Sequence, residues 1–303
     1  FAVAFLSVNP LSAKYLTILA LIVVLIFGVE TAGGIGAVIH NASELPGYLS
    51  MTLSYDVNTG KAAPYSALTI VSTAAWGLGY FGMPHILLRF MAIEDEKKLK
   101  LSRRVATIWV VISLFVAVFI GVIGYTMSKV GALEMLTGSN SETIIVKISA
   151  LLSQHGVIFA LLAGVILAGI LASTMSTSDS QLLAASSAVS SDILGAFRKD
   201  SSNKNGSMAA ARITLLVISV VAAFIARNPD SSVFAIVSFA WAGFGAAFGP
   251  VVLFSLFWKR TNKWGALAGM VCGGSMVFIW KYLIRPLGGI WNIYELLPAF
   301  LIA

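Results

Sequence analysis

Long apolar segments recur along the whole chain and constrain its fold more than any other feature. A bilayer excludes charge and requires backbone polar groups to pair within their own segment, so apolar runs of about 20 residues indicate spanning helices. About seven such runs are present, and a partial one begins at Trp291. The predicted spans are Tyr15–Ile39, Tyr65–Met91, Val105–Ser128, Gly156–Val189, Ala209–Ala226, Ser232–Trp258 and Trp264–Ile284. We therefore expect an all-α polytopic membrane protein.

The charged residues are few, and their positions argue against a soluble protein. Only 11% of residues are charged and 58% are hydrophobic, whereas soluble domains carry roughly a quarter charged residues. The net charge of +7 comes from short loops and not from one basic face, so we expect no nucleic-acid partner. No metalloprotease, nucleophile-elbow or phosphate-loop motif is present, so we expect neither an enzyme nor a cofactor.

The distribution of basic residues predicts how the chain crosses the membrane. Lysine and arginine concentrate in the loops after the second, fourth and sixth spans, which the positive-inside rule places in the cytoplasm. Two outer loops, Asn41–Pro64 and Lys129–His155, are long, and the second contains a predicted short helix near Glu142–Ser153. Because the chain starts at Phe1 and its last apolar run stops at Ala303, we expect residues 1–303 to be one transmembrane domain and a fragment of a larger protein.

The second predicted span contains residues that a continuous helix tolerates poorly. Gly77, Gly79, Gly82 and Pro84 lie within eight residues. Glycine costs about 1 kcal/mol relative to alanine in a helix interior, and proline about 3 kcal/mol. In a bilayer, such a break is tolerated where protein or a water-filled cavity satisfies the freed carbonyls, and transporters place binding sites there. The segment thus predicts a binding site in which Trp76 and Tyr80, spaced i, i+4, wall an apolar pocket; the alternative is a kinked, glycine-packed helix without a ligand.

The fourth predicted span carries a dense polar run from Ser173 to Gln181, in which every residue but Met175 is polar. Helical spacing places Ser173, Ser176, Thr177 and Ser180 on one face. Hydroxyl and carbonyl oxygens suit small hard cations, and a mostly neutral set favours a monovalent ion such as sodium. The embedded Asp179 strengthens this hypothesis, because intramembrane carboxylates are costly and usually functional. The alternative is that the hydroxyls only join helices by hydrogen bonds of about 0.6 kcal/mol each.

The sixth predicted span is rich in glycine and alanine between Ala240 and Gly249. Small residues let helices approach closely, so we expect this stretch to pack against another helix, with a flexing joint at Gly249-Pro250.

Several long stretches resemble the sodium:solute symporter family, and within it the bacterial carriers of proline. The similar stretches are 76–85 with 89–92, 175–177 with 181–183, 238–255 and 265–270, and the resemblance extends from about Leu16 to the end of the chain. It implies an inverted-repeat core of five plus five helices, with the second repeat at about 64–258 and peripheral helices after it. The first repeat's broken helix is absent from this sequence, so we expect the chain alone not to transport.

The resemblance also implies roles for individual residues. Trp76, Tyr80 and Pro84 would contribute to the proline pocket, and Ser173 (through its carbonyl), Ser176 and Thr177 would bind sodium. Some members of the family bind a second sodium near the positions of Asp179 and Ser180. An aspartate at this position departs from the proline-carrier pattern, which leaves the number of sodium ions open.

The expected function is sodium-coupled symport of L-proline into the cytoplasm by alternating access, in the inner membrane of a bacterium. Proline, sodium and the lipid bilayer are the expected partners. Two alternatives remain at this point: a carrier of another small solute (an amino acid, a carboxylate or a sugar), and a transporter-like membrane sensor that responds to sodium.

Overall fold

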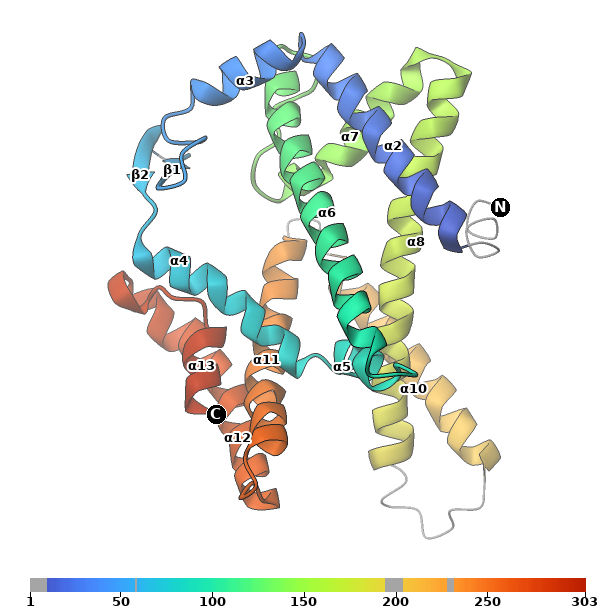
Figure 1. Cartoon of the computed structure of the whole chain (residues 1–303), viewed down its shortest axis with the longest axis vertical. Coiled ribbons are helices and arrows are strands. Elements are labelled where there is room, and N and C mark those ends of the chain that lie inside the picture. Colours follow the sequence, from blue (N-terminus) through green and yellow to red (C-terminus); the bar gives the residue numbers. More distant parts are fainter. Residues whose placement is uncertain (1–9, 58, 194–203, 228–231) are drawn as a thin grey trace. The chain divides into compact units, whose positions relative to one another are not determined.

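The computed structural model describes residues 10–57, 59–193, 204–227 and 232–303. The chain divides into two compact units: Phe1–Ala42 with Arg103–Ser231, and Ser43–Ser102 with Ser232–Ala303. Each unit thus combines two separate stretches of sequence (Figure 1). The described chain is helical apart from one antiparallel hairpin of β1 (Leu53–Asp56) and β2 (Lys61–Pro64), in which Leu53 pairs with Pro64 and Asp56 with Lys61. This hairpin lies within the predicted outer loop Asn41–Pro64, so the expected all-α architecture of the spans holds.

The first unit consists of long apolar helices joined by short helical turns. Its elements are α2 (Pro10–Thr31), α3 (Ile35–Ser43), α6 (Lys98–Lys129), η2 (Gly138–Thr143), α7 (Ile144–Leu152), η3 (Ser153–His155), α8 (Val157–Ser187), the π-helix η4 (Ala188–Ile193) and α10 (Lys204–Ile225). Its core joins α2, α6, α7 and α8 around Val24, Ile123, Met127, Ile148 and Leu152, all almost fully buried. The short helix predicted near Glu142–Ser153 is present as α7.

The first predicted span is bent, which corrects the expectation of one helix over Tyr15–Ile39. Helix α2 ends at Thr31 and α3 begins at Ile35, with an angle of 75° between them. Gly33 and Gly34 lie at the break with φ of 89° and 95°, a left-handed backbone that glycine adopts without steric cost. Apolar composition does not predict this change of direction, because glycine occurs both within apolar helices and in turns.

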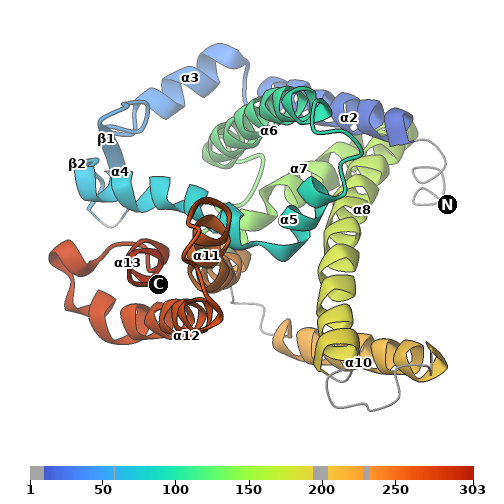
Figure 2. The same ribbon diagram turned by 60° about the horizontal axis from the view of Figure 1, so that its bottom comes forward.

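The second unit contains the hairpin, an interrupted helix and a group of C-terminal helices. After the hairpin come α4 (Ala67–Ala74), the 3₁₀ segment η1 (Ala75–Gly82) and α5 (Pro84–Met91). The C-terminal part consists of α11 (Val233–Phe257), α12 (Lys263–Ile279), the π-helix η5 (Trp280–Ile284), the 3₁₀ turns η6 (Arg285–Leu287) and η7 (Gly289–Trp291), and α13 (Leu296–Ile302). Helices α11, α12 and α13 pack together around Ala242, Ala246, Val277, Leu296 and Ala299 (Figure 2).

Five helices of the described chain are long and apolar enough to cross a membrane, and the bent pair α2–α3 makes a sixth if it counts as one span. The five long helices agree with five of the seven predicted spans. The predicted span Tyr65–Met91 is not a continuous helix, because η1 separates α4 from α5. Many large apolar side chains on these helices are exposed, such as Leu161 on α8 and Leu216 on α10, as expected of residues that face lipid.

Candidate functional site

The interrupted segment in the second unit has the geometry that its sequence predicts. Helix α4 starts at the N-cap Ser66, whose side chain accepts a hydrogen bond from the Thr69 amide, and it changes to a 3₁₀ helix at Ala75. The 3₁₀ segment ends at the extended residue Met83, and Pro84 then starts α5 at a position where a proline ring is compatible with a helix. The chain therefore makes a break of helical geometry between Ala75 and Met83, and Trp76 and Tyr80 lie inside it.

Helix α11 packs against this break through small residues, as the glycine- and alanine-rich stretch predicted. A Cβ atom on Gly79 would overlap the indole of Trp241, and one on Gly82 would overlap the carbonyl of Phe244. Reciprocally, a Cβ on Gly245 would lie 2.7 Å from the Cα of Gly79. The two backbones thus approach as closely as they do because neither has a side chain at the contact.

A hydrogen bond joins the two elements at this close contact. The indole Nε1–H of Trp241 donates a hydrogen bond of 2.9 Å to the carbonyl of Trp76. The ring of Trp76 is stacked with Trp241 at 5.5 Å between centroids, and Tyr80 meets Trp241 edge-on at 4.7 Å. The structure therefore brings the predicted pair Trp76 and Tyr80 together on Trp241, a residue that the sequence placed only in a packing segment.

The Trp76 ring has two further aromatic neighbours in the same unit. Phe234 and Tyr294 are stacked with it at 5.6 Å and 5.8 Å between ring centroids. Tyr80 is 50% exposed, so its ring remains accessible to a small solute. Pro84, the third predicted substrate residue, starts α5 and is exposed. These five rings, Trp76, Tyr80, Phe234, Trp241 and Tyr294, form an aromatic wall beside the break.

Tyr294 and Glu295 were not among the residues that the sequence singled out. The Tyr294 hydroxyl donates a 2.6 Å hydrogen bond to the carbonyl of Ser238, and its backbone N–H donates one of 2.8 Å to the hydroxyl of Ser72. The only signal in the sequence was an acidic residue, Glu295, that follows the basic residues Lys281 and Arg285 across a short loop.

The predicted ion-binding residues lie on α8 in the first unit, and four of them share a face. The hydroxyl of Thr177 donates to the carbonyl of Ser173 at 3.2 Å, and that of Ser180 donates to the carbonyl of Ser176 at 3.0 Å. Because the hydroxyl protons are used within the helix, the oxygen lone pairs point away from it and are available to a cation. These residues are exposed, apart from Ser180, which is half-buried.

Asp179 is exposed on α8, and the described part of the chain gives its carboxylate neither an ion pair nor a hydrogen bond. A cavity of about 300 Å³ extends from the Ser173 end of the polar run. It is lined by Leu21, Val165, Ile166, Gly169, Ile170, Ser173 and Thr174. Within the residues that the structure describes, no three His, Cys, Asp or Glu side chains cluster in a way that would hold a metal ion. A sodium site built from hydroxyl and carbonyl oxygens does not require such a cluster.

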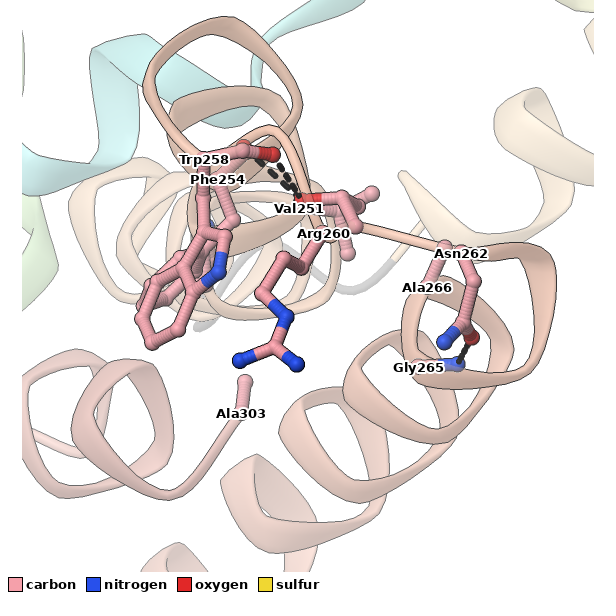
Figure 3. A pocket seen from close by; sticks show the side chains of 10 residues that line it. Val251, Phe254, Trp258, Arg260, Asn262, Gly265, Ala266 and Ala303 are labelled. Carbon is pink, nitrogen blue, oxygen red and sulfur yellow. Dashed lines mark hydrogen bonds between the residues drawn. The ribbon is translucent and has the colours of Figure 1, made fainter.

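A larger cavity of about 400 Å³ lies between α11 and α12 in the second unit (Figure 3). Its walls include Phe254, Trp258 and Arg260, and the guanidinium of Arg260 is directed toward Ala303. The Thr261 hydroxyl closes the turn between the helices by donating to the carbonyls of Phe254 and Trp258 at 2.9 Å each. None of the predicted site residues lines this cavity.

Comparison with known proteins adds a second line of information to this geometry. Residues 8–273 match the sequence model of the Sodium:solute symporter family. The chain is 36% identical to the osmoregulated proline transporter OpuE of Bacillus subtilis over 284 residues. The aligned region covers 94% of this chain and 54% of that protein. It is 40% identical to the sodium/proline symporter of Salmonella typhimurium over 235 residues, and this aligned region covers 77% of this chain and 45% of that protein. The chain therefore spans about half the length of these relatives, and no solved structure matches it significantly.

Proposed function

The chain belongs to the sodium:solute symporter family and is a multi-pass membrane protein, and from this premise we propose that it is part of a transporter that carries L-proline into the cytoplasm together with sodium. The names of the relatives, a proline transporter and a sodium/proline symporter, support proline as the solute. Membership of the family supports sodium as the coupling ion. The chain spans about half of their length. In this proposal the transporting unit is a longer polypeptide, and residues at about 64–258 supply the second of its two inverted five-helix repeats.

The observation that carries this proposal is the break at η1 and the aromatic wall around it. A carrier needs a site within the membrane where the backbone is not fully paired, and half-helix ends next to such a break are suited to a zwitterionic solute. Trp76 and Tyr80 provide the aromatic surface against which the pyrrolidine ring of proline packs. Pro84 follows them in the chain and starts α5. The ring of proline is small and apolar on its faces, which matches an aromatic wall.

Sodium binds, in this proposal, at the exposed polar face of α8, through the Ser173 carbonyl and the hydroxyls of Ser176 and Thr177. Asp179 and Ser180 offer a second cation position one turn further along the helix. Sodium binding favours the state that is open to the outside, and its differential affinity for that state raises the population of the proline-binding conformation. The membrane potential contributes about 2.3 kcal/mol per charge per 100 mV to inward movement.

The proposal is tested by uptake of labelled proline into liposomes that contain the complete transporter. We expect uptake to require an imposed sodium gradient, and Thr177→Ala to raise the sodium concentration that gives half-maximal uptake about 10-fold or more, as for loss of a polar group that binds a charge. Thr174→Ala is the matched control, because Thr174 makes the same hydroxyl-to-carbonyl bond in the same helix, to Ile170 at 2.9 Å, and belongs to no predicted ligand set.

Two outcomes of this test count against parts of the proposal. Uptake driven by a proton gradient without sodium overturns the assignment of the α8 face. Sodium-dependent uptake of another labelled solute, with no competition by proline, retains the symporter and overturns proline as its cargo.

A further inference from the structure

Tyr294 contacts three elements of the second unit at once. Its backbone N–H bonds to Ser72 in α4, its hydroxyl bonds to the carbonyl of Ser238 in α11, and its ring is stacked with Trp76 in η1. These elements are the helix before the break, the break itself and the helix that packs on it. The position of Tyr294 therefore affects the aromatic wall directly.

The residue after Tyr294 carries a buried charge. The Glu295 side chain is 2% exposed, and its carboxylate lies 2.9 Å from Nη1 of Arg285 and 4.0 Å from Nζ of Lys281. Arg285 also donates from Nε to the side-chain oxygen of Asn292 at 3.1 Å. The Lys281 ammonium lies 3.9 Å from the centroid of the Phe239 ring, a cation–π contact with α11. One guanidinium thus joins residues on both sides of Tyr294 along the chain.

A buried carboxylate is costly unless it is paired, so the Glu295 side chain determines where its segment lies. With Arg285 in place, residues 292–295 are tied to η6 through the Asn292 and Glu295 side chains, and the Tyr294 hydroxyl is bonded to the Ser238 carbonyl. Removing the carboxylate leaves Arg285 with Asn292 alone, so the segment keeps the Ser72 and Ser238 bonds of Tyr294 but loses its tie at Glu295.

We propose that Glu295, through its ion pair with Arg285, is a positioning residue that holds Tyr294 against Trp76 and thereby sets the shape of the solute-binding wall. This role rests on the proposed solute site at η1. The backbone of Trp76 is held independently by the Trp241 indole, so loss of the ion pair moves the Trp76 ring and leaves the break itself in place.

The first test is the kinetics of proline uptake by the complete transporter with Glu295→Gln. We expect the KM for proline to rise about 10- to 100-fold, the range for misplacing a binding group by about 1 Å, while the maximal rate per molecule changes less. The matched control is Glu134→Gln, which removes a glutamate paired with Lys147 at 2.6 Å on the surface of the other unit. A fall in maximal rate in proportion to protein abundance, with an unchanged KM, shows a merely structural role and overturns the proposal.

A double-mutant cycle shows whether Glu295 acts through Tyr294. In a Tyr294→Ala background, Glu295→Gln no longer changes the KM, because the ring that it positions is gone. An equal effect in both backgrounds overturns the proposal.

A second measurement needs no transport and separates this inference from the proposed function. The chain is labelled with 5-fluorotryptophan, and the ¹⁹F resonances of Trp76 and Trp241 are assigned by Trp→Phe variants. Glu295→Gln is expected to shift or broaden the Trp76 resonance in the same direction as Tyr294→Ala, with a smaller change at Trp241. If the wild type carries no proline but this shift is present, the proposed function fails and the positioning role stands; an unshifted Trp76 resonance overturns the positioning role.

Discussion

Replacing Gly79 by alanine tests the contact on which the candidate site depends. The added Cβ would overlap the Trp241 indole, which is fixed by its hydrogen bond to the Trp76 carbonyl and by its contacts with two aromatic rings. The Gly79 backbone also contacts α11 at Gly245, where an added Cβ would lie 2.7 Å from the Gly79 Cα. Overpacking of this kind costs about 1 to 3 kcal/mol, and loss of the indole hydrogen bond adds about 1 kcal/mol. We expect Gly79→Ala to lower the free energy of unfolding by about 2 to 4 kcal/mol.

The matched control for this change is Gly77→Ala, two residues away in the same 3₁₀ segment. A Cβ on Gly77 meets no atom within 4 Å, and its φ is not positive. We expect Gly77→Ala to raise the free energy of unfolding by less than about 1 kcal/mol, because alanine restricts the unfolded chain more than glycine does. Unfolding is measured in mixed micelles by titration with a denaturing detergent, followed by tryptophan fluorescence.

Two results would refute this reasoning. Equal free energies for the Gly79 and Gly77 variants show that the contact with α11 does not limit the site. If the indole is the obstacle, the cost of Gly79→Ala falls in a Trp241→Phe background, because the smaller ring leaves room for the methyl group. An undiminished cost there shows that the strain comes from elsewhere.

Two further predictions concern the first unit. Gly34→Ala is expected to lower the free energy of unfolding by about 1 to 2 kcal/mol, because the φ of Gly34 is 95°, in the left-handed region. The control is Gly36→Ala, where the added Cβ also meets open space but φ is not positive, and this change is expected to be neutral or stabilising. Equal thermal stabilities of the two variants would contradict this. The hydrogen bond and charge of Lys147 lower the pKa of Glu134. The pair therefore stabilises the folded state at pH values above the ordinary glutamate pKa, and this contribution is lost as the pH falls through the lowered pKa. The difference in Tm between wild type and Glu134→Gln should therefore disappear on acidification from pH 7 to pH 3, and a difference that grows at low pH would show the opposite sign of linkage.

Three parts of the second unit meet at the aromatic wall around Trp76. The segment η1 carries Trp76 and Tyr80, α11 supplies the indole that donates to the Trp76 carbonyl, and the segment before α13 supplies Tyr294. Each contact comes from a different part of the chain. The C-terminal helices of this unit therefore complete the wall at η1 as well as packing beside it.

The sequence by itself determined the membrane class, the positions of the long helices and the break between Ala75 and Met83. These are properties of single segments: a bilayer forces backbone pairing within each helix, and glycine and proline disturb that pairing wherever they occur. The shared face of Ser173, Ser176, Thr177 and Ser180 was likewise predicted, because helical periodicity fixes it. The bend at Gly33 and Gly34 was missed, since an average over apolar residues is the same for a straight helix and a bent one.

Only the tertiary structure decided which segments meet. Trp241 and Trp76 are 165 residues apart, and Tyr294 and Ser72 are 222 residues apart. Their pairing depends on how each helix is rotated and packed, and local periodicity does not contain that information. The burial of Glu295 is of the same kind: its charge is visible in the sequence, but its partners Arg285 and Lys281 converge on it only because a π-helix and two short 3₁₀ turns fold the chain back.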